Sequence, residues 1–144
     1  MKVILLLGLC LHLIYVSEGK IFRRCEIVKI ANEQLDGYAG ASAADWTCLM
    51  EHESDYNSAL IQDNQAQSRD YGIFQINSKY WCDDGRIDTA NRCNIKCWKF
   101  LDNYLEDDIE CAKKIATHAN GLSPWNSWVN QCEGHDLTNY MDGC

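Results

Sequence analysis

The stretch SRDYGIFQINSKYWC, residues 68–82, combines aromatic and β-branched residues with polar ones and is interrupted by a single glycine, Gly72. Such a composition is typical of a short β-hairpin. Asp70 falls at the start of this predicted hairpin, close in sequence to the amides of Gln75 and Asn77. The hairpin is therefore expected to hold a carboxylate in polar surroundings.

Two helices are predicted on the N-terminal side of the hairpin. Residues 26–33 carry apolar side chains with the spacing of an amphipathic helix. The sequence SAAD, residues 42–45, has the form of a capping box, with Ser42 as the N-cap and an acidic residue three positions later. The helix that begins there runs through WTCLMEHE, so Glu53 falls near its C-terminal end, where the helix dipole disfavours a negative charge.

A long loop and two further helices are predicted on the C-terminal side. Residues 82–97 are rich in turn-forming residues, and EDDIECAKKIATHAN, residues 106–120, returns to helical spacing. Gly121 follows as a predicted C-cap. The last helix is predicted to begin with Ser123 as N-cap and Pro124, the only proline, as its first residue. The fold class is therefore α+β, mainly helical with a small antiparallel sheet.

The first 19 residues have the composition of a secretory signal peptide. Lys2 precedes the apolar run VILLLGLCLHLIYV, and small residues stand three and one positions before Lys20. The run is too short to span a bilayer, and no second apolar stretch approaches the roughly 18 residues required. We therefore expect a signal peptide over residues 1–19, one secreted extracellular domain over residues 20–144, and no membrane insertion.

The cysteines agree with an extracellular location. One of the nine, Cys10, lies in the predicted signal peptide, which leaves eight. An even number of cysteines in a short secreted chain is typical of a disulfide framework. No C-x-x-C pair is present, which argues against a zinc site, but the sequence by itself leaves the pairing of the eight cysteines open.

The net charge restricts the class of partner. Lys2 and Glu18 offset each other, so residues 20–144 keep the formal charge of −8. A negative field disfavours nucleic acids and anionic membranes. It also gives the domain no long-range attraction to an anionic polymer such as a bacterial cell wall.

Glu53 and Asp70 together have the chemistry that cleavage of a glycosidic bond requires. The reaction needs one acid to protonate the leaving oxygen and one carboxylate to meet the developing positive charge. Glu53 follows an apolar helix, whereas Asp70 lies in a polar hairpin, so their surroundings are expected to differ. A glutamate and an aspartate at this spacing are, however, more often two ordinary surface carboxylates than a catalytic pair.

Several motifs make the chain similar to the C-type lysozyme and α-lactalbumin family. They are HESDYN, SRDYGIFQINSKYWC, CNIKC, CAKKI and NGLSPWNSW, and the eight cysteines of residues 20–144 follow the family's spacing. The resemblance implies a lysozyme-like fold in which a substrate cleft separates a helical lobe from a small antiparallel β lobe. It also implies four disulfides, Cys25–Cys144, Cys48–Cys132, Cys82–Cys97 and Cys93–Cys111.

The same resemblance implies a candidate active site. Glu53 would be the acid and Asp70 the nucleophile of a retaining, bacteriolytic glycosidase that cleaves β-1,4 bonds between N-acetylmuramic acid and N-acetylglucosamine in peptidoglycan, or in related chitooligosaccharides. Retaining enzymes hold the two carboxyl groups about 5 Å apart. His118 stands where some members have a sugar-contacting aspartate. We expect a monomer with seven substrate-binding residues, Asn64, Gln75, Asn77, Tyr80, Trp81, Asn120 and Trp125.

The stretch KFLDNYLEDD, residues 99–108, resembles the calcium loop of α-lactalbumins and calcium-binding lysozymes. Calcium favours about six to eight oxygen ligands. The resemblance implies one structural calcium ion bound by the side chains of three aspartates and by two backbone carbonyls. These ligands are Asp102, Asp107 and Asp108, with the carbonyls of Lys99 and Tyr104. Acids that complement the helix dipole would explain Asp107 and Asp108 without a metal, but not Asp102.

Two functions other than catalysis are compatible with the sequence. A non-catalytic modulator of a galactosyltransferase, like α-lactalbumin, typically lacks the acid that Glu53 supplies. Its partner-binding surface is matched only in part, because Glu51, Asn139 and Tyr140 stand where an aromatic residue, Gln and Trp are typical. A saccharide-binding lysozyme-like protein with little turnover, of the sperm-associated type, agrees with the acidic charge.

Overall fold

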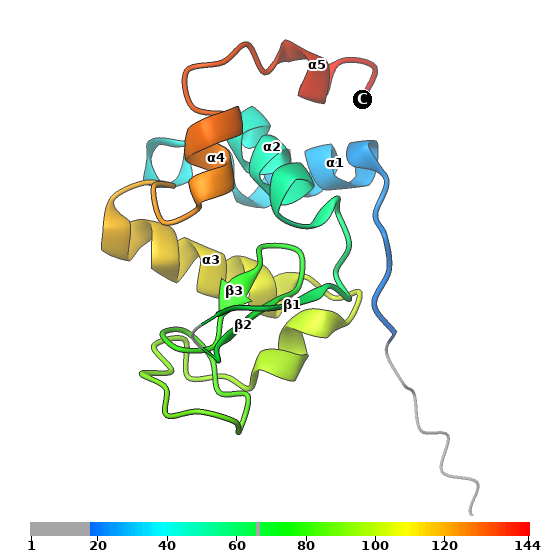
Figure 1. Ribbon diagram of the computed structural model, residues 1–144. Coiled ribbons are helices and arrows are strands. Elements are labelled where there is room, and N and C mark those ends of the chain that lie inside the picture. Colours follow the sequence, from blue (N-terminus) through cyan, green and yellow to red (C-terminus); the bar gives the residue numbers. More distant parts are fainter. Residues whose placement is uncertain (1–17, 66) are drawn as a thin grey trace, which may run out of the picture.

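The computed structural model of the protein describes residues 18–65 and 67–144, so the predicted signal peptide lies almost wholly outside the described residues. The α-helices are α1 (Arg24–Gln34), α2 (Ala43–Ser54), α3 (Glu106–Ala119), α4 (Asn126–Gln131) and α5 (Thr138–Met141). Two 3₁₀ helices, η1 (Tyr38–Gly40) and η2 (Cys97–Leu101), and three strands, β1 (Ile61–Asp63), β2 (Arg69–Tyr71) and β3 (Ile76–Asn77), complete the fold. Figure 1 shows α1, α2, α4 and α5 above α3, with the sheet and η2 below.

Both N-terminal helices form where the sequence predicts them. α1 contains the predicted residues 26–33, and α2 begins directly after Ser42. The Asp45 amide donates to the Ser42 hydroxyl, and the Ser42 amide donates to the Asp45 carboxylate, so the predicted capping box is present. α2 ends at Ser54, which places Glu53 in its last turn.

The sheet confirms the predicted hairpin and adds a strand to it. β2 and β3 pair antiparallel, with Asp70 opposite Asn77, and β1 pairs with the other edge of β2. Gly72, in the turn, has a φ of 74°, and a Cβ built there would lie 2.2 Å from the carbonyl oxygen of Phe100. Only glycine therefore lets the hairpin pack this closely against η2.

The predicted boundaries of the last two helices are wrong by one or two residues. α3 ends with Asn120, and not Gly121, in the left-handed conformation as its C-cap. α4 begins at Asn126 with Trp125 as N-cap, so the predicted N-cap at Ser123 is two residues too early. The indole of Trp125 is buried and donates to the carbonyl of Phe74 at 2.8 Å. This tertiary contact accompanies an extended backbone at Trp125 and a later helix start.

Disulfides and a shared core hold the lobes together. All four implied disulfides are present, joining Cys25–Cys144, Cys48–Cys132, Cys82–Cys97 and Cys93–Cys111. A disulfide typically contributes about 2–4 kcal/mol to the free energy of unfolding. Trp46 of α2, Phe74 of the hairpin and Phe100 of η2 are completely buried in one core. Within the described residues, no helix is both long and apolar enough to cross a membrane.

Candidate active site

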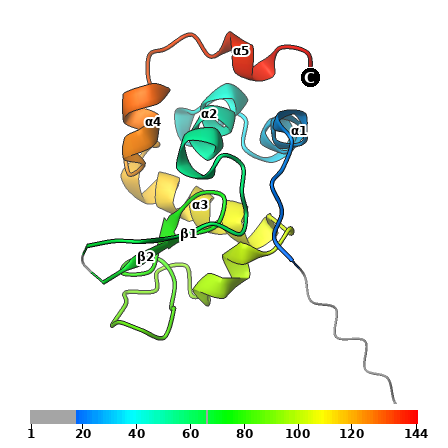
Figure 2. The ribbon, with the colours of Figure 1, turned by 45° about the vertical axis from the view of Figure 1, so that its right-hand side comes forward.

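A cleft of about 420 Å³ brings together residues of α2, the sheet, α3 and the start of α4. Figures 1 and 2 show the sheet below α2 and α4 in both views, with α3 beside it. The lining combines carboxylates, amides and aromatic rings, which is the chemistry of a saccharide site. The cleft is lined by Glu53, Asp70, Gln75, Ile76, Asn77, Tyr80, Trp81, Ile115, Pro124, Trp125 and Asn126.

Glu53 is half-buried in the last turn of α2 and has a perturbed acidity. Burial raises the pKa of its carboxyl group, because a desolvated carboxylate is less stable than the neutral acid. The hydroxyl of Ser127 donates a hydrogen bond to Glu53 Oε1 and lowers this pKa, while the negative charge of Asp70 raises it. The pKa of Glu53 lies above its ordinary value as a result, which suits a proton donor.

Asp70, by contrast, accepts a hydrogen bond from a neighbouring side-chain amide. Asn77, its partner on β3, donates from Nδ2 to Asp70 Oδ1 at 2.7 Å and to Ser68 Oγ at 3.1 Å. Ser68 Oγ is also 3.4 Å from Nδ2 of Asn64. Donors aimed at a carboxylate stabilise its negative charge. The cleft therefore holds two carboxyl groups in different surroundings.

Seven of the nine predicted catalytic and substrate-binding residues line the cleft, and two do not. The side chain of Asn64 contacts Ser68 at the end of the hairpin, and Asn120 caps α3 as an exposed residue outside the cleft lining. Gln75 lines the cleft, but its side-chain amide donates to the carbonyls of Gly72 and Leu60 at 2.8 and 3.2 Å. Gln75 therefore holds the hairpin shape as well as forming the cleft wall.

The sequence did not predict Ser127 as a site residue. Its hydroxyl contacts Glu53 across a separation of 74 residues, and neither residue's local pattern indicates the other. The only available signal was its position two residues after Trp125, within the motif NGLSPWNSW. Ile76, Ile115, Pro124 and Asn126 also line the cleft without having been predicted.

The predicted calcium loop is only partly arranged as a cation site. Asp108 is completely buried, neither of its carboxylate oxygens has a hydrogen-bond partner among the described residues, and burial raises its pKa well above the ordinary value. Such an orphaned carboxylate fits a metal ligand. Asp107, however, lines a separate depression with Glu110 and Lys114, and Asp102 Oδ1 accepts from the amide of Tyr104 at 2.7 Å. Within the described chain, the oxygens of the three aspartates do not all lie within 4.8 Å of one another, although the negative charges of Asp102 and Asp107, in addition to burial, raise the pKa of Asp108.

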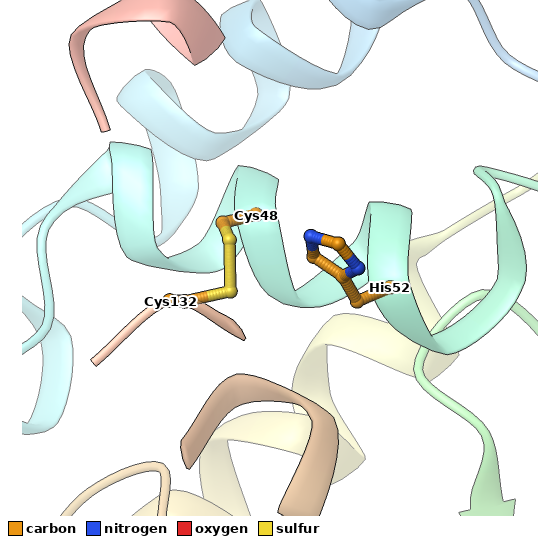
Figure 3. Close-up of side chains that lie close together, drawn as sticks. All are labelled: Cys48, His52 and Cys132. Atoms are coloured by element: carbon orange, nitrogen blue, oxygen red, sulfur yellow. A yellow bond between two sulfur atoms is a disulfide. The ribbon is translucent and has the colours of Figure 1, made fainter. Parts of the chain in front are cut away.

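A second group with metal-ligating side chains is not available to a metal. Cys48, His52 and Cys132 lie within 4.8 Å of one another (Figure 3). The two cysteines are joined in a disulfide, as the figure shows, and zinc-binding cysteines must be thiolates. His52 instead lies 2.9 Å from the hydroxyl of Tyr140 and connects α2 to α5.

Comparisons with known proteins agree with the fold and the motifs. The model of the C-type lysozyme/alpha-lactalbumin family matches residues 20–144. The milk isozyme of lysozyme C from Canis lupus familiaris is 46% identical over 127 residues, covering 87% of this chain and 98% of the dog protein. Human sperm acrosome-associated protein 5 is 41% identical over 133 residues, covering 92% and 84% of the two chains. The crystal structure of lysozyme from Equus asinus is 42% identical, with a TM-score of 0.82, and covers 87% and 98%. The chain therefore belongs to the C-type lysozyme/α-lactalbumin family.

Proposed function

We propose that the protein is a secreted retaining glycosidase, a lysozyme, that cleaves β-1,4 bonds between N-acetylmuramic acid and N-acetylglucosamine in peptidoglycan. The observation that carries this proposal is the pair of carboxyl groups in one cleft. Glu53 has a raised pKa through burial, and Asp70 faces the amide donor of Asn77. Glycosidases separate the roles of their acid and their nucleophile by such a difference in surroundings.

In the proposed mechanism the two groups act in turn on the same bond. Glu53 gives its proton to the glycosidic oxygen as the bond to the anomeric carbon breaks, and the carboxylate of Asp70 forms a bond to that carbon from the other face. The ionised Glu53 then takes a proton from water, whose oxygen displaces Asp70. Glu53 is protonated again, Asp70 is released, and the configuration at the anomeric carbon is retained.

The remaining cleft residues support saccharide binding. Tyr80 is 46% exposed beside Trp81, so both rings can pack against the apolar faces of sugar rings. Asn126 adds an amide group that matches sugar hydroxyls and N-acetyl groups, whereas the amide of Asn77 is bonded to Asp70 and Ser68. A cleft with one catalytic pair and several such positions suits a chain of sugars rather than a small ligand.

Two accompanying proposals concern secretion and calcium. Four disulfides support an extracellular location, which agrees with the signal peptide predicted over residues 1–19. The orphaned carboxylate of Asp108 supports one structural calcium ion, with Asp102 and the carbonyls of Lys99 and Tyr104 as further ligands. Burial and the negative charges of Asp102 and Asp107 raise the pKa of Asp108, and this supports Asp107 as a further ligand.

The similarity to human sperm acrosome-associated protein 5 supports a second candidate, a saccharide-binding protein with little turnover. The experiment that separates the two is hydrolysis of a soluble chitooligosaccharide and of peptidoglycan by oxidised residues 20–144. Glu53→Gln keeps the shape of the side chain and removes its acid, so the glycosidase loses activity by about a hundredfold or more. Binding without hydrolysis by the unmodified protein would support the second candidate instead.

A further inference from the structure

Another depression, of about 550 Å³, lies outside the cleft, where α3 meets Tyr38 of η1. Its lining consists of Tyr38, Glu110, Lys113, Lys114, Thr117 and His118. The ring of Tyr38 and the methylene stems of the two lysines form an apolar wall, and the ammonium groups at the ends of these stems add positive charge. The depression therefore suits a ligand that has both apolar groups and negative charge.

The two lysines of this depression are available to an anion. Lys113 Nζ lies 5.1 Å from the ring centre of Tyr38, and Lys114 Nζ donates to the carbonyl of Arg92 at 3.4 Å. An ammonium group has three protons to donate, so both groups keep capacity for further acceptors. Within the described part of the chain, no carboxylate oxygen lies within 4.0 Å of either nitrogen, although other cations are paired in this way. Glu110 is the single acid in the lining.

Hydrogen bonds hold the ring of Tyr38 in place. Its hydroxyl oxygen lies 2.9 Å from Oγ1 of Thr117, and the Thr117 hydroxyl donates to the carbonyl of Lys113 at 2.9 Å. Because the Thr117 hydroxyl has only one proton, Tyr38 is the donor in the first of these bonds. The apolar wall is thus fixed before a ligand arrives, which lowers the entropy cost of binding.

The depression begins where the cleft ends. His118, in the last turn of α3, lines the depression, and its ring centre lies 5.9 Å from that of Trp81, which lines the cleft. The carbonyl of Arg92 accepts from Lys114, and the guanidinium carbon of Arg92 lies 5.4 Å from the Trp81 ring centre. A branch on a saccharide seated beside Trp81 therefore has the depression as its neighbour across the imidazole of His118.

We propose that this depression binds the acidic peptide branches that peptidoglycan carries on its N-acetylmuramic acid rings, while the saccharide chain lies in the cleft. The inference rests on the proposed function and deepens it, since it gives the peptide component of the substrate a site of its own outside the cleft. Carboxylates of the branch pair with Lys113 and Lys114, and its methyl and methylene groups pack against Tyr38. A phosphate polymer would match the lysines but not the apolar wall.

Such a site also offsets the charge of the domain. The formal charge of −8 repels an acidic peptide at long range, so binding requires a local group of cations of the kind that Lys113 and Lys114 supply. Neither lysine lines the cleft. Both therefore determine the affinity for peptide-bearing strands and take no part in bond cleavage.

The test compares three tetrasaccharides of alternating N-acetylglucosamine and N-acetylmuramic acid that differ only in what is attached to the lactyl groups. The first carries a methylamide, the second alanylglutamine amide and the third alanylglutamate. The second and third have branches of the same shape, but only the third has carboxylates. Dissociation constants are measured at low and high salt with Glu53→Gln, which prevents turnover.

Three changes are each added to this variant, and thermal unfolding checks that every protein is folded. Lys113→Gln together with Lys114→Gln removes the proposed partners and keeps part of the apolar stems. Glu110→Gln removes the single acid of the lining. Lys29→Gln is the matched control, because Lys29 is an exposed lysine on a different helix, α1.

We expect the alanylglutamate probe to bind about fivefold more tightly than the alanylglutamine amide probe at low salt, the size of a good exposed ion pair. High salt and the double lysine change should each remove most of this preference. Glu110→Gln should increase the preference, and Lys29→Gln should retain it. Equal or weaker binding of the acidic probe, or a preference that survives the double lysine change, overturns the inference.

Hydrolysis of a peptide-free chitooligosaccharide by the unmodified protein is measured in parallel, so that this inference and the proposed function fail separately. Turnover without a preference for the acidic branch overturns this inference alone. A preference without turnover overturns the proposed hydrolysis alone. The absence of both binding and turnover overturns the two together.

Discussion

The hydroxyl of Ser127, at the second position of α4, donates a hydrogen bond to Oε1 of Glu53 in the last turn of α2. This contact opposes the effect of burial on the Glu53 carboxyl group, because it stabilises the ionised form. It also fixes the orientation of one carboxyl oxygen relative to the cleft. Ser127 is thus placed to position the proposed acid and to adjust the pH range in which that acid is protonated.

Ser127→Ala is predicted to extend activity to higher pH. Without the donor, the pKa of Glu53 rises further, and the acid stays protonated to a higher pH before activity is lost. The high-pH limb of the kcat/KM profile for a chitooligosaccharide should therefore move upward. Ser123→Ala, an exposed change in the same segment, should leave the limb in place. A downward shift with Ser127→Ala would show that the hydroxyl does not stabilise the carboxylate.

Asn77→Ala is predicted to weaken the action of Asp70. The change removes the amide that donates to Asp70 Oδ1 at 2.7 Å. Hydrogen bonds to charged groups contribute about 1.5–3 kcal/mol, so kcat/KM should fall by about tenfold or more. Asn64→Ala is the control, because Asn64 belongs to the same network but contacts Ser68. Thermal unfolding of both variants separates an effect on catalysis from a loss of folding, and equal activities for the two variants would contradict the assignment.

Calcium is predicted to raise the unfolding temperature. An ion at about a hundred times its dissociation constant adds about 2.7 kcal/mol to the free energy of unfolding, and this corresponds to a rise of about 10 °C in a domain of this size. Calorimetry with calcium and with EDTA measures the difference. Asp107→Asn should reduce it, since the change removes one of the three proposed carboxylate ligands. Identical unfolding temperatures in calcium and EDTA would remove the proposed site.

Trp125→Phe is predicted to destabilise the protein. The indole N–H donates to the carbonyl of Phe74 at 2.8 Å, and the ring lies 6.0 Å from that of Trp46. Loss of the donor leaves a buried carbonyl unpaired and should cost about 1–3 kcal/mol in urea unfolding. Trp98→Phe changes a ring that is 61% exposed and should stay within about 0.5 kcal/mol of the parent protein. A similar loss for both variants would contradict the structural role of Trp125.

Local patterns were enough to predict the elements that local interactions stabilise. The capping box of Ser42 and Asp45 specifies the start of α2, and the aromatic and β-branched composition of residues 68–82 specifies the hairpin. β1 was not predicted, because its three residues are all exposed and show no alternation of buried and exposed side chains. The strand is recognised only by its pairing with β2. The late start of α4 depends on where the indole of Trp125 is buried, which no pattern within the segment reveals.

The residues of the candidate site were likewise predictable where a local motif contains them and not where contacts between distant segments bring them together. Motif resemblance predicted the residues that line the cleft from β2, β3 and α2, since these elements bring their whole motifs to one place. It could not predict that Ser127 contacts Glu53 or that Arg92 lies beside Trp81, because both are contacts between distant segments. It also placed Asn120 in the site, although the residue serves as the left-handed cap of α3.

The most direct test of the proposed catalytic pair is the configuration of the first product, followed by NMR during hydrolysis of a chitooligosaccharide. If Glu53 protonates the leaving oxygen and Asp70 forms the glycosyl intermediate, the β-anomer of the new reducing end appears first and equilibrates later with the α-anomer. Glu53→Gln and Asp70→Asn should each remove the signal. An α-anomer as the first product would mean that water attacks directly, and it would contradict the role assigned to Asp70.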